Sequence, residues 1–510
     1  MSNFAELLEN EAKNIQPNVS VTENGAVGYK TSGSKLVDCN FALGSMRNMS
    51  EDEIWAKFLA AYNENPTLAL RWLFFARDLR GGAGERRTFR VIFARLCKEN
   101  PSVAIRLVKL IPEYGRWDDL IEMMFSGAPR NVCDEVFSVI NAQLDEDFRN
   151  ALNKKPISLL SKWLPSANTS SKETCKRAET LRHMLGWTPR EYRKKLSMLR
   201  QHIDVVERKM SAQEWDQIKY EGVPSKAAMN YREAFTRHDG DRYGEYLTNV
   251  KEGNAKINAG TLFPYDIVSA YRNTRQVDET LEAQWKALPN YVSPDESTLV
   301  VVDGSGSMYC GIDSNSHVEA IHVAWALGIY FAERLRGPYR DRFITFSSHP
   351  QMVGLRHDLT LRSKLDIIEG YDDCSNTDIK KVFDLVLNTA VKNRLSQKDL
   401  PKNILIVSDG EFDGMTWNYD YGPADQALFD AIAEEYRDEG YFLPRLVFWN
   451  VNSRTGTIPL TQNDLGVALV SGFSPSIADM VLSGKLDPYG CLVDKLMSER
   501  YNPVTEALKE

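Results

Sequence analysis

Hydrophobic residues in the first half of the chain recur every three or four positions, which is the period of amphipathic helices. Ser50 and Glu53 form a capping-box pattern at the start of the first of these helices. Two later helices are predicted to begin at Asn65-Pro66 and Asn100-Pro101, because asparagine is a good helix cap and proline is tolerated at the first helical position. Their starts are about 35 residues apart, a spacing typical of helical-hairpin repeats such as HEAT repeats. The pattern therefore predicts an α-helical HEAT-like repeat region over residues 50–285.

The pattern changes in the second half of the chain, where short apolar runs alternate with helical segments. The runs that lead to Asp303 and Asp409 are rich in β-branched residues, which is typical of strands covered on both faces. Alternating strands and helices predict an α/β doubly wound domain over residues 298–510.

Two segments have neither pattern. Prolines and turn residues at 286–297 predict a linker between the helical region and the α/β domain. Residues 18–48 are polar and rich in glycine and serine, so residues 1–49 are predicted to form an extended N-terminal segment.

The composition is that of a globular protein with sizeable cores: of 510 residues, 43% are hydrophobic and 26% are charged. The net charge of −8 excludes a global basic signature for nucleic acid, so any such site must be local. The seven cysteines form no Cys-X-X-Cys pair, which favours a reducing compartment and argues against structural zinc. The N-terminal residues do not resemble a signal peptide, and no apolar run reaches the ~20 residues of a membrane helix, so we expect a cytoplasmic protein without membrane contact.

Candidate metal ligands follow the first apolar run of the α/β domain. Asp303, Ser305 and Ser307 alternate there with two glycines, which allow a tight turn. One carboxylate and two hydroxyls are hard oxygen donors that suit Mg²⁺, Mn²⁺ or Ca²⁺, whereas zinc favours Cys and His. The alternative is an ordinary turn at the end of a strand, in which the aspartate only caps a helix.

The DGSGS sequence after an apolar strand resembles the Asp-X-Ser-X-Ser motif of von Willebrand factor A domains. In that family a metal-ion-dependent adhesion site (MIDAS) takes further ligands from two later loops. Matching residues follow here in the same order, with Thr377 in CSNTD and Asp409 at the end of NILIVSD. The resemblance implies that Asp303, Ser305, Ser307, Thr377 and Asp409 together bind Mg²⁺, with Mn²⁺ or Ca²⁺ as alternatives. It also implies that the metal binds a carboxylate of a protein ligand.

The window from Lys154 to Lys226 is locally basic, with sixteen basic and eight acidic residues in a chain of net charge −8. Helix starts are predicted inside it at Thr188-Pro189 and, from a second capping-box pattern, at Ser211. The helix that begins at Pro189 spreads positive charge over one broad side. The candidate RNA-binding residues are Lys176, Arg177, Arg190, Arg193, Lys194, Lys195 and Arg200.

Aromatic residues are interspersed with these cations, among them Trp187, Tyr192, Trp215, Tyr220 and Tyr243. A basic surface with rings that stack on bases is typical of proteins that bind single-stranded RNA. The alternative is that the rings belong to the core and the cations form a solvated helix face.

The order of these regions resembles that of the TROVE proteins, which include the Ro autoantigen and its bacterial relatives. Several segments, among them FFARDLRGGAGERRTFR and LGWTPREYRKKLSMLR, are similar to a branch of A-domain proteins found in plants, fungi, bacteria and viruses. The resemblance implies a ring of helices closed by an A domain, which binds misfolded or small non-coding RNAs as a ribonucleoprotein. It carries over no individual RNA contact.

No catalytic motif accompanies these sites. The sequence has no His-Glu-X-X-His zinc motif and no Gly-X-X-X-X-Gly-Lys loop, and its GGAG segment follows a helix rather than a strand. We therefore expect a non-enzymatic, Ro-like RNA-binding protein that uses a Mg²⁺-dependent MIDAS for a protein ligand. The alternatives are a MIDAS-dependent interaction or scaffold protein without RNA, such as a partner of an AAA+ ATPase, and a metal-dependent hydrolase.

Overall fold

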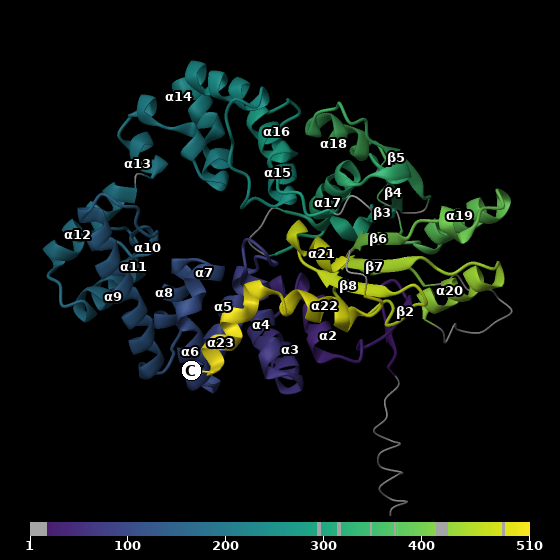
Figure 1. The fold of residues 1–510 in the computed structure, drawn as a ribbon, viewed down its shortest axis with the longest axis horizontal. Coiled ribbons are helices and arrows are strands. Elements are labelled where there is room, and N and C mark those ends of the chain that lie inside the picture. Colours follow the sequence, from purple (N-terminus) through teal and green to yellow (C-terminus); the bar gives the residue numbers. More distant parts are fainter. Residues whose placement is uncertain are drawn as a thin grey trace, which may run out of the picture.

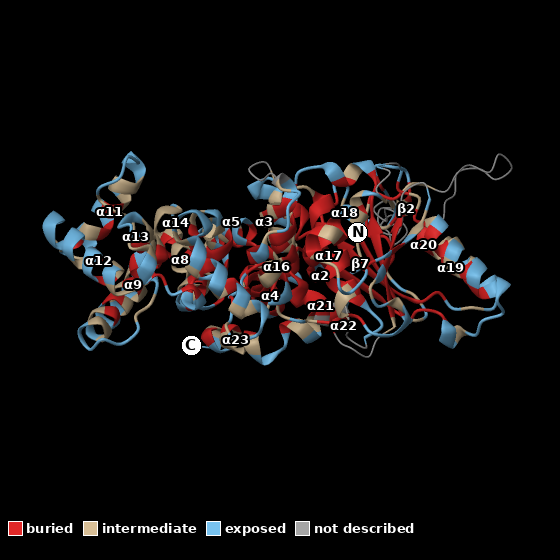
Figure 2. Ribbon diagram, turned by 90° about the horizontal axis from the view of Figure 1, so that it is seen from above, coloured by how far each residue is buried: buried red, intermediate tan, exposed pale blue. Residues whose placement is uncertain are grey.

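An arc of helices and an α/β domain make up the fold (Figure 1). The computed structural model describes residues 18–203, 205–292, 297–313, 318–346, 349–371, 374, 376–414, 427–481 and 485–509. Buried residues are concentrated in the sheet and the helices next to it (Figure 2). By contrast, α11 (Lys172–Met184) and α12 (Pro189–Ile203) are largely exposed in the same view.

The N-terminal segment is a hairpin followed by a helix. Strands β1 (Ser20–Val21) and β2 (Val27–Gly28) pair antiparallel, and α2 (Lys35–Phe41) follows them. The prediction of an extended segment up to residue 49 is therefore wrong for α2. Its helix forms because Ser34 accepts a hydrogen bond from the Val37 amide at the N-terminus, while most of its apolar side chains are buried.

The helical region was predicted correctly in kind and at several helix starts. Asn65 accepts a hydrogen bond from the Leu68 amide (3.0 Å), and Asn100 accepts one from the Val103 amide (3.4 Å), so both Asn-Pro starts are confirmed. The remaining helices of the arc are α3 (Glu51–Glu64), α4 (Pro66–Arg77), α5 (Arg86–Glu99), α6 (Pro101–Leu107), α7 (Ile111–Tyr114), α8 (Trp117–Phe125), α9 (Arg130–Leu152), α10 (Leu160–Trp163), α13 (Val206–Ser211), α14 (Ser225–Lys251), α15 (Pro264–Ala270) and α16 (Glu279–Lys286).

The α/β domain is a doubly wound six-stranded sheet. Its order is β5-β4-β3-β6-β7-β8, which corresponds to 3-2-1-4-5-6 in chain order, and only the edge strand β5 is antiparallel to its neighbour. The strands are β3 (Thr298–Asp303), β4 (Arg342–Phe346), β5 (Gln351–Gly354), β6 (Asn403–Ser408), β7 (Arg445–Asn450) and β8 (Val467–Ser471). The helices are α17 (Ala320–Arg334), α18 (Leu361–Glu369), α19 (Lys380–Lys392), α20 (Leu428–Asp438), α21 (Ala478–Val481), α22 (Pro488–Leu496) and α23 (Asn502–Lys509).

Helices cover both faces of this sheet. Phe448 and Trp449 are neighbours in β7, so their side chains point to opposite faces. The Phe448 ring contacts Phe429 of α20 (centroids 4.8 Å apart), and the Trp449 ring contacts Phe331 of α17 (5.5 Å). This double cover explains why the strands are almost continuously apolar in sequence.

Both ends of the helical arc pack against the α/β domain. At the start of the arc, α4 contacts α22 and α23, and Arg500 forms an ion pair with Asp78 at the end of α4. At the end of the arc, α15 contacts α17, and Trp285 of α16 donates a hydrogen bond to Glu333 of α17 (2.8 Å). The arc and the α/β domain therefore form a closed circuit of contacts, visible in Figure 1.

The apolar core has two parts. Residues of α13, of α14 and of the segment between them, including Tyr220, Phe235 and Tyr243, form a cluster of their own. Nearly all other buried apolar residues of the described chain, from α12 as well as from the sheet, form one continuous cluster. No helix in the described ranges is both long and apolar enough to cross a membrane.

Candidate functional site

The candidate metal site lies at the carboxyl ends of β3 and β6. Asp303 is the last residue of β3, and Asp409 directly follows β6. These two strands are hydrogen-bonded neighbours, with Val302 opposite Val407. In the order 3-2-1-4-5-6 they flank the point where the winding direction reverses, which is where doubly wound sheets bind their ligands.

Asp303 is a buried carboxylate held by neutral donors. Its Oδ1 accepts from the Ser305 amide (2.9 Å), and its Oδ2 accepts from the Ser408 hydroxyl (2.5 Å). No basic side chain in the described part of the chain pairs with it. Burial, and then the charge of Asp409, raise the pKa of Asp303 to about 7, although the two serine hydrogen bonds oppose this.

Three more predicted ligands, Ser305, Ser307 and Asp409, lie at the same carboxyl end of the sheet and are linked by hydrogen bonds. The hydroxyls of Ser305 and Ser307 are 3.0 Å apart. Burial raises the pKa of Asp409, while the positive charge of Arg454 and hydrogen bonds from the Glu411 amide and from Ser307 oppose this. The structure thus places Asp303, Ser305, Ser307 and Asp409 together.

Thr377 is connected to these residues through the side chain of Asn24. Its amide donates to Asp413 (3.1 Å), and its hydroxyl accepts from the side-chain amide of Asn24 (3.2 Å). The same Asn24 amide donates to the carbonyl of Glu411 (2.7 Å), two residues after Asp409. All five predicted metal ligands therefore lie at one end of the sheet, with Asn24 between Thr377 and the rest.

An arginine that the sequence did not mark as part of this site, Arg454, lies beside Asp409. The Nη1 of Arg454 is 3.2 Å from the Oδ2 of Asp409, and the guanidinium also pairs with Glu23. The Arg454 amide donates to Glu411 (2.7 Å). Arg454 lies in the loop after β7 and has no motif around it, so only the folded chain brings it to the site.

The donor set fits a hard divalent cation. Two carboxylates and several hydroxyls are the ligand types that Mg²⁺ and Ca²⁺ prefer. A buried carboxylate without a basic partner, such as Asp303, is costly unless it is protonated or a cation binds it. Among the described residues, no group of three or more His, Cys, Asp or Glu side chains is placed to hold a metal. A metal here would thus depend on hydroxyls and water for its remaining ligands.

Some of the candidate RNA-binding side chains are exposed, and others make contacts within the protein. Lys176, Arg190, Arg193 and Lys194 are exposed on α11 and α12. Lys195 lies over the ring of Trp187, 4.0 Å from its centroid.

The other two candidates, Arg177 and Arg200, form ion pairs or hydrogen bonds within the protein. Arg177 pairs with Glu122 (2.9 Å) and Glu173 (2.7 Å). Arg200 donates to the carbonyls of Ser161 (2.8 Å) and Leu164 (2.7 Å), so its guanidinium fastens α12 to the α10 region. For these two residues the structural role is the better-supported one.

A groove runs beside α12. It has a volume of about 810 Å³ and is lined by the loop after α10 and by residues of α12 and α13, including Arg193, Arg200 and Arg208. By contrast, most of the aromatic residues predicted to stack on bases are in the core. Tyr192 is buried and donates to the Pro165 carbonyl (2.7 Å), and Tyr220 and Tyr243 belong to the α13–α14 core.

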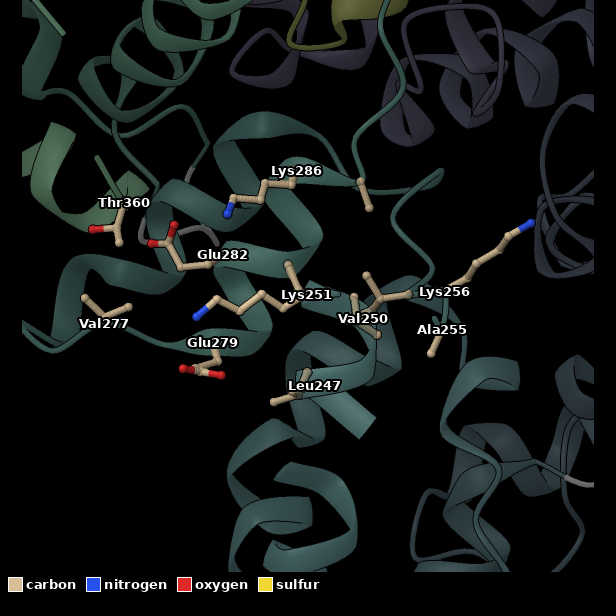
Figure 3. A pocket seen from close by; sticks show the side chains of 13 residues that line it. Leu247, Val250, Lys251, Ala255, Lys256, Val277, Glu279, Glu282, Lys286 and Thr360 are labelled. Atoms are coloured by element: carbon tan, nitrogen blue, oxygen red, sulfur yellow. The ribbon is translucent and has the colours of Figure 1, made fainter. Parts of the chain in front are cut away.

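A second cavity, which the sequence did not indicate, lies between α14, α16 and the start of α18 (Figure 3). Its volume is about 510 Å³. Lys251 and Lys286 extend toward the cavity from different helices, near Glu279 and Glu282. Glu282 caps α18 by accepting from the Leu361 amide (2.8 Å), so this glutamate has a structural role.

Comparison with known families divides the chain at the predicted linker. A family model described as domain of unknown function DUF2828 matches residues 22–147 and 130–295, and one described as domain of unknown function DUF7788 matches residues 297–495. The chain is also similar to uncharacterized protein L728 of Acanthamoeba polyphaga mimivirus. The two are 30% identical over an aligned length of 531 residues, gaps included, and the alignment covers 96% of this chain and 89% of the relative.

Proposed function

The chain belongs to the DUF2828 family and carries a C-terminal DUF7788 domain, and we propose that this α/β domain is a von Willebrand factor A-like domain that binds Mg²⁺. Through the metal it binds an acidic protein ligand. The observation that carries the proposal is the meeting of Asp303 and Asp409 at the reversal point of the sheet, where Asp303 is buried without a basic partner among the described residues.

In this proposal each residue has a defined role. Asp303 and Asp409 supply the negative charge, directly or through water, and Ser305, Ser307 and Thr377 supply hydroxyl ligands. Mg²⁺ retains water in its remaining positions. The metal, when bound, supplies a positive charge for a carboxylate of the partner.

The donor set favours binding over catalysis. Metal-assisted hydrolysis needs a general base or a second metal ion. The Asp303 and Asp409 carboxylates are assigned to one cation, and the neighbouring carboxylates of Glu411 and Asp413 accept from backbone amides, so we assign none of them as a base. We therefore propose a non-enzymatic protein.

Isothermal titration calorimetry with Mg²⁺ and Mn²⁺ tests the metal site. The wild-type protein should bind one cation and gain thermal stability, because a ligand that binds only the native state stabilises it. Asp303→Asn should eliminate both effects. Asp464→Asn is the matched control, because Asp464 is an exposed partner of Arg437 in the same domain. Equal metal affinity in Asp303→Asn and wild type would refute the site.

RNA binding by the helical arc is the second candidate function. Four exposed cations on α11 and α12, together with the groove that contains Arg193, support it. The closed circuit of a helical arc and an α/β domain is also the layout that a TROVE-like, HEAT-repeat ribonucleoprotein would have. We propose that RNA phosphates bind along α12 and that a small or misfolded RNA is the ligand.

Purification without nuclease provides the first test of this second function. The protein should carry excess absorbance at nucleic-acid wavelengths, and nuclease should remove it. A preparation free of nucleic acid that also fails to shift a panel of small RNAs would leave the Mg²⁺-dependent protein interaction as the function.

A further inference from the structure

The N-terminal strap, defined here as residues 20–29, packs against the loop that follows β6, at the end of the sheet that carries the candidate metal ligands. The Thr22 hydroxyl donates to the Phe412 carbonyl (2.6 Å), and the Glu23 amide donates to the Glu411 carboxylate (2.8 Å). Beyond the turn, the Gly414 amide donates to the Asn24 carbonyl (3.0 Å).

The other end of the strap is held by backbone pairing. Tyr29 and Ile458 exchange two backbone hydrogen bonds of 2.8 Å each. The chain that follows is anchored separately, because the Ser32 amide donates to Asp38 (2.7 Å) at the start of α2. The strap can thus detach while α2 stays in place.

Two side chains of the strap contact residues of the candidate metal site. Asn24 donates to the hydroxyl of Thr377, and the Glu23 carboxylate pairs with Arg454, which is itself beside Asp409. Four of the five candidate ligands are closed to solvent: Asp303 and Asp409 are 0% exposed, and Ser305 and Thr377 are 1% exposed. With the strap seated, these four ligands present almost no accessible surface to a carboxylate from another protein.

We propose that the N-terminal strap is a built-in occupant of the ligand face of the metal site, and that an external acidic ligand binds only after the strap is released. The inference rests on the proposed metal site and adds its regulation. The strap presents an acidic residue and an amide from the turn of its hairpin, so a competing partner should present an acidic residue on an exposed turn.

Two glycines make the close fit of the strap possible. A Cβ at Gly28 would lie 2.7 Å from the Ile458 carbonyl oxygen, and a Cβ at Gly414 would lie 2.7 Å from the Gly25 carbonyl oxygen. Substitution at Gly28 therefore loosens the strap from its own side and leaves the surface beneath it unchanged. Gly354→Ala is the matched control, because a Cβ there meets nothing within 4 Å.

The test measures release of bound Mn²⁺ into excess chelator by stopped flow in the full-length protein. Gly28→Ala should release Mn²⁺ at least about tenfold faster than wild type, because release no longer waits for local opening of the strap. Water-proton relaxation by the bound Mn²⁺ should also rise. Gly354→Ala should match wild type in both measurements. Hydrogen exchange at the Tyr29 amide reports whether the strap has detached.

The possible outcomes are distinct. A detached strap with a Mn²⁺ release rate within about twofold of wild type would overturn the inference. If exchange at Tyr29 stays slow in Gly28→Ala, the triple substitution Thr22→Ala, Asn24→Ala and Gly28→Ala provides the released state, and the same criterion applies. Mn²⁺ binding to the released variant alone would support the inference, whereas no Mn²⁺ binding to any variant would overturn the proposed metal site itself.

Discussion

Arg454 places its Nη1 3.2 Å from the Oδ2 of Asp409, so a carboxylate proposed to hold Mg²⁺ already has a positively charged neighbour. The guanidinium also pairs with Glu23 of the N-terminal strap. The arginine therefore opposes binding of a second cation and ties the strap to the site.

Replacing this arginine should strengthen metal binding. Arg454→Gln removes a unit positive charge beside the site, so we expect the Kd for Mg²⁺ to fall by about tenfold or more in calorimetry at low salt. Arg437→Gln is the control, because Arg437 is a surface cation of the same domain. Unchanged or weaker Mg²⁺ binding by Arg454→Gln would show that the arginine does not compete with the metal.

The exposed cations of α12 should determine RNA affinity. Replacing Arg190, Arg193 and Lys194 with glutamate should weaken RNA binding and reduce its salt dependence, by roughly one unit of log–log slope for each RNA phosphate that the variant no longer neutralises. A gel-shift titration at several salt concentrations measures both quantities.

A charge-matched control for that variant is available in the α/β domain. Lys392, Lys398 and Lys402 are exposed there, and their replacement with glutamate changes the net charge by the same amount. Equal weakening by both variants would indicate a general charge effect, and equal binding by the α12 variant and wild type would remove α12 from the interface.

RNA binding and metal binding should be separable. The cations of α12 and the candidate metal ligands lie in different parts of the fold, and no described contact joins them. A gel shift in EDTA should therefore match one in excess Mg²⁺ at fixed ionic strength. If chelation eliminated RNA binding while circular dichroism showed an intact fold, an RNA phosphate would be the ligand of the metal.

The buried ion pair of Asp119 should be important for stability. Asp119 accepts from Arg77 at 2.8 and 2.7 Å and from Arg90 at 2.7 Å, and its side chain is wholly buried. Asp119→Asn should lower the free energy of unfolding by roughly 3–5 kcal/mol, because it leaves a buried arginine without its counter-charge. Urea denaturation followed by circular dichroism measures the effect. Asp464→Asn, at an exposed pair, should cost at most about 1 kcal/mol.

Acid should loosen the C-terminal helices from the arc. Burial tends to raise the pKa of Asp78, but hydrogen bonds from Arg500 and from the backbone outweigh it, so the pKa lies below its usual value. A carboxyl whose pKa is lower in the folded state stabilises the fold above its unfolded pKa of about 3.9, and this contribution is lost as the pH falls from ~5 toward the folded pKa. The Tm should therefore drop over this range.

The variant Asp78→Asn tests this assignment. It should have a lower Tm at neutral pH and a smaller further loss in acid than wild type, because the titrating group is gone. An acid dependence of the Tm identical to that of wild type would assign the loss to other carboxyls.

Local patterns predicted the features that depend on a few neighbouring residues. Asn65 and Asn100 cap their helices as expected, and Asp303 ends a buried strand as its apolar run indicated. The predicted helix start at Ser211 is wrong: this residue is the last of α13, and its hydroxyl donates to the Glu207 carbonyl (2.8 Å). The spacing of a capping box alone does not distinguish the start of one helix from the end of another.

Contacts between distant parts of the chain that no motif marks were not predictable. Asn24 contacts Thr377, and Glu23 contacts Arg454, across more than 350 positions in each case. No local pattern encodes such pairs, because the sheet order and the path of the loops bring them together. The same applies to Arg200, whose charge suggested an RNA contact although its guanidinium binds backbone carbonyls of the α10 region.

The closed circuit of contacts has a consequence for synthesis on the ribosome. Tyr29 pairs with Ile458, and Asp78 pairs with Arg500, so some of the earliest parts of the chain await partners that are made last. At ~5–20 residues per second, the first strands wait roughly 20–90 s for the loop that they join. During that time unpaired strand edges and apolar helix faces are exposed to other chains. Nascent chains of this protein should therefore depend on chaperones until the final helix leaves the exit tunnel.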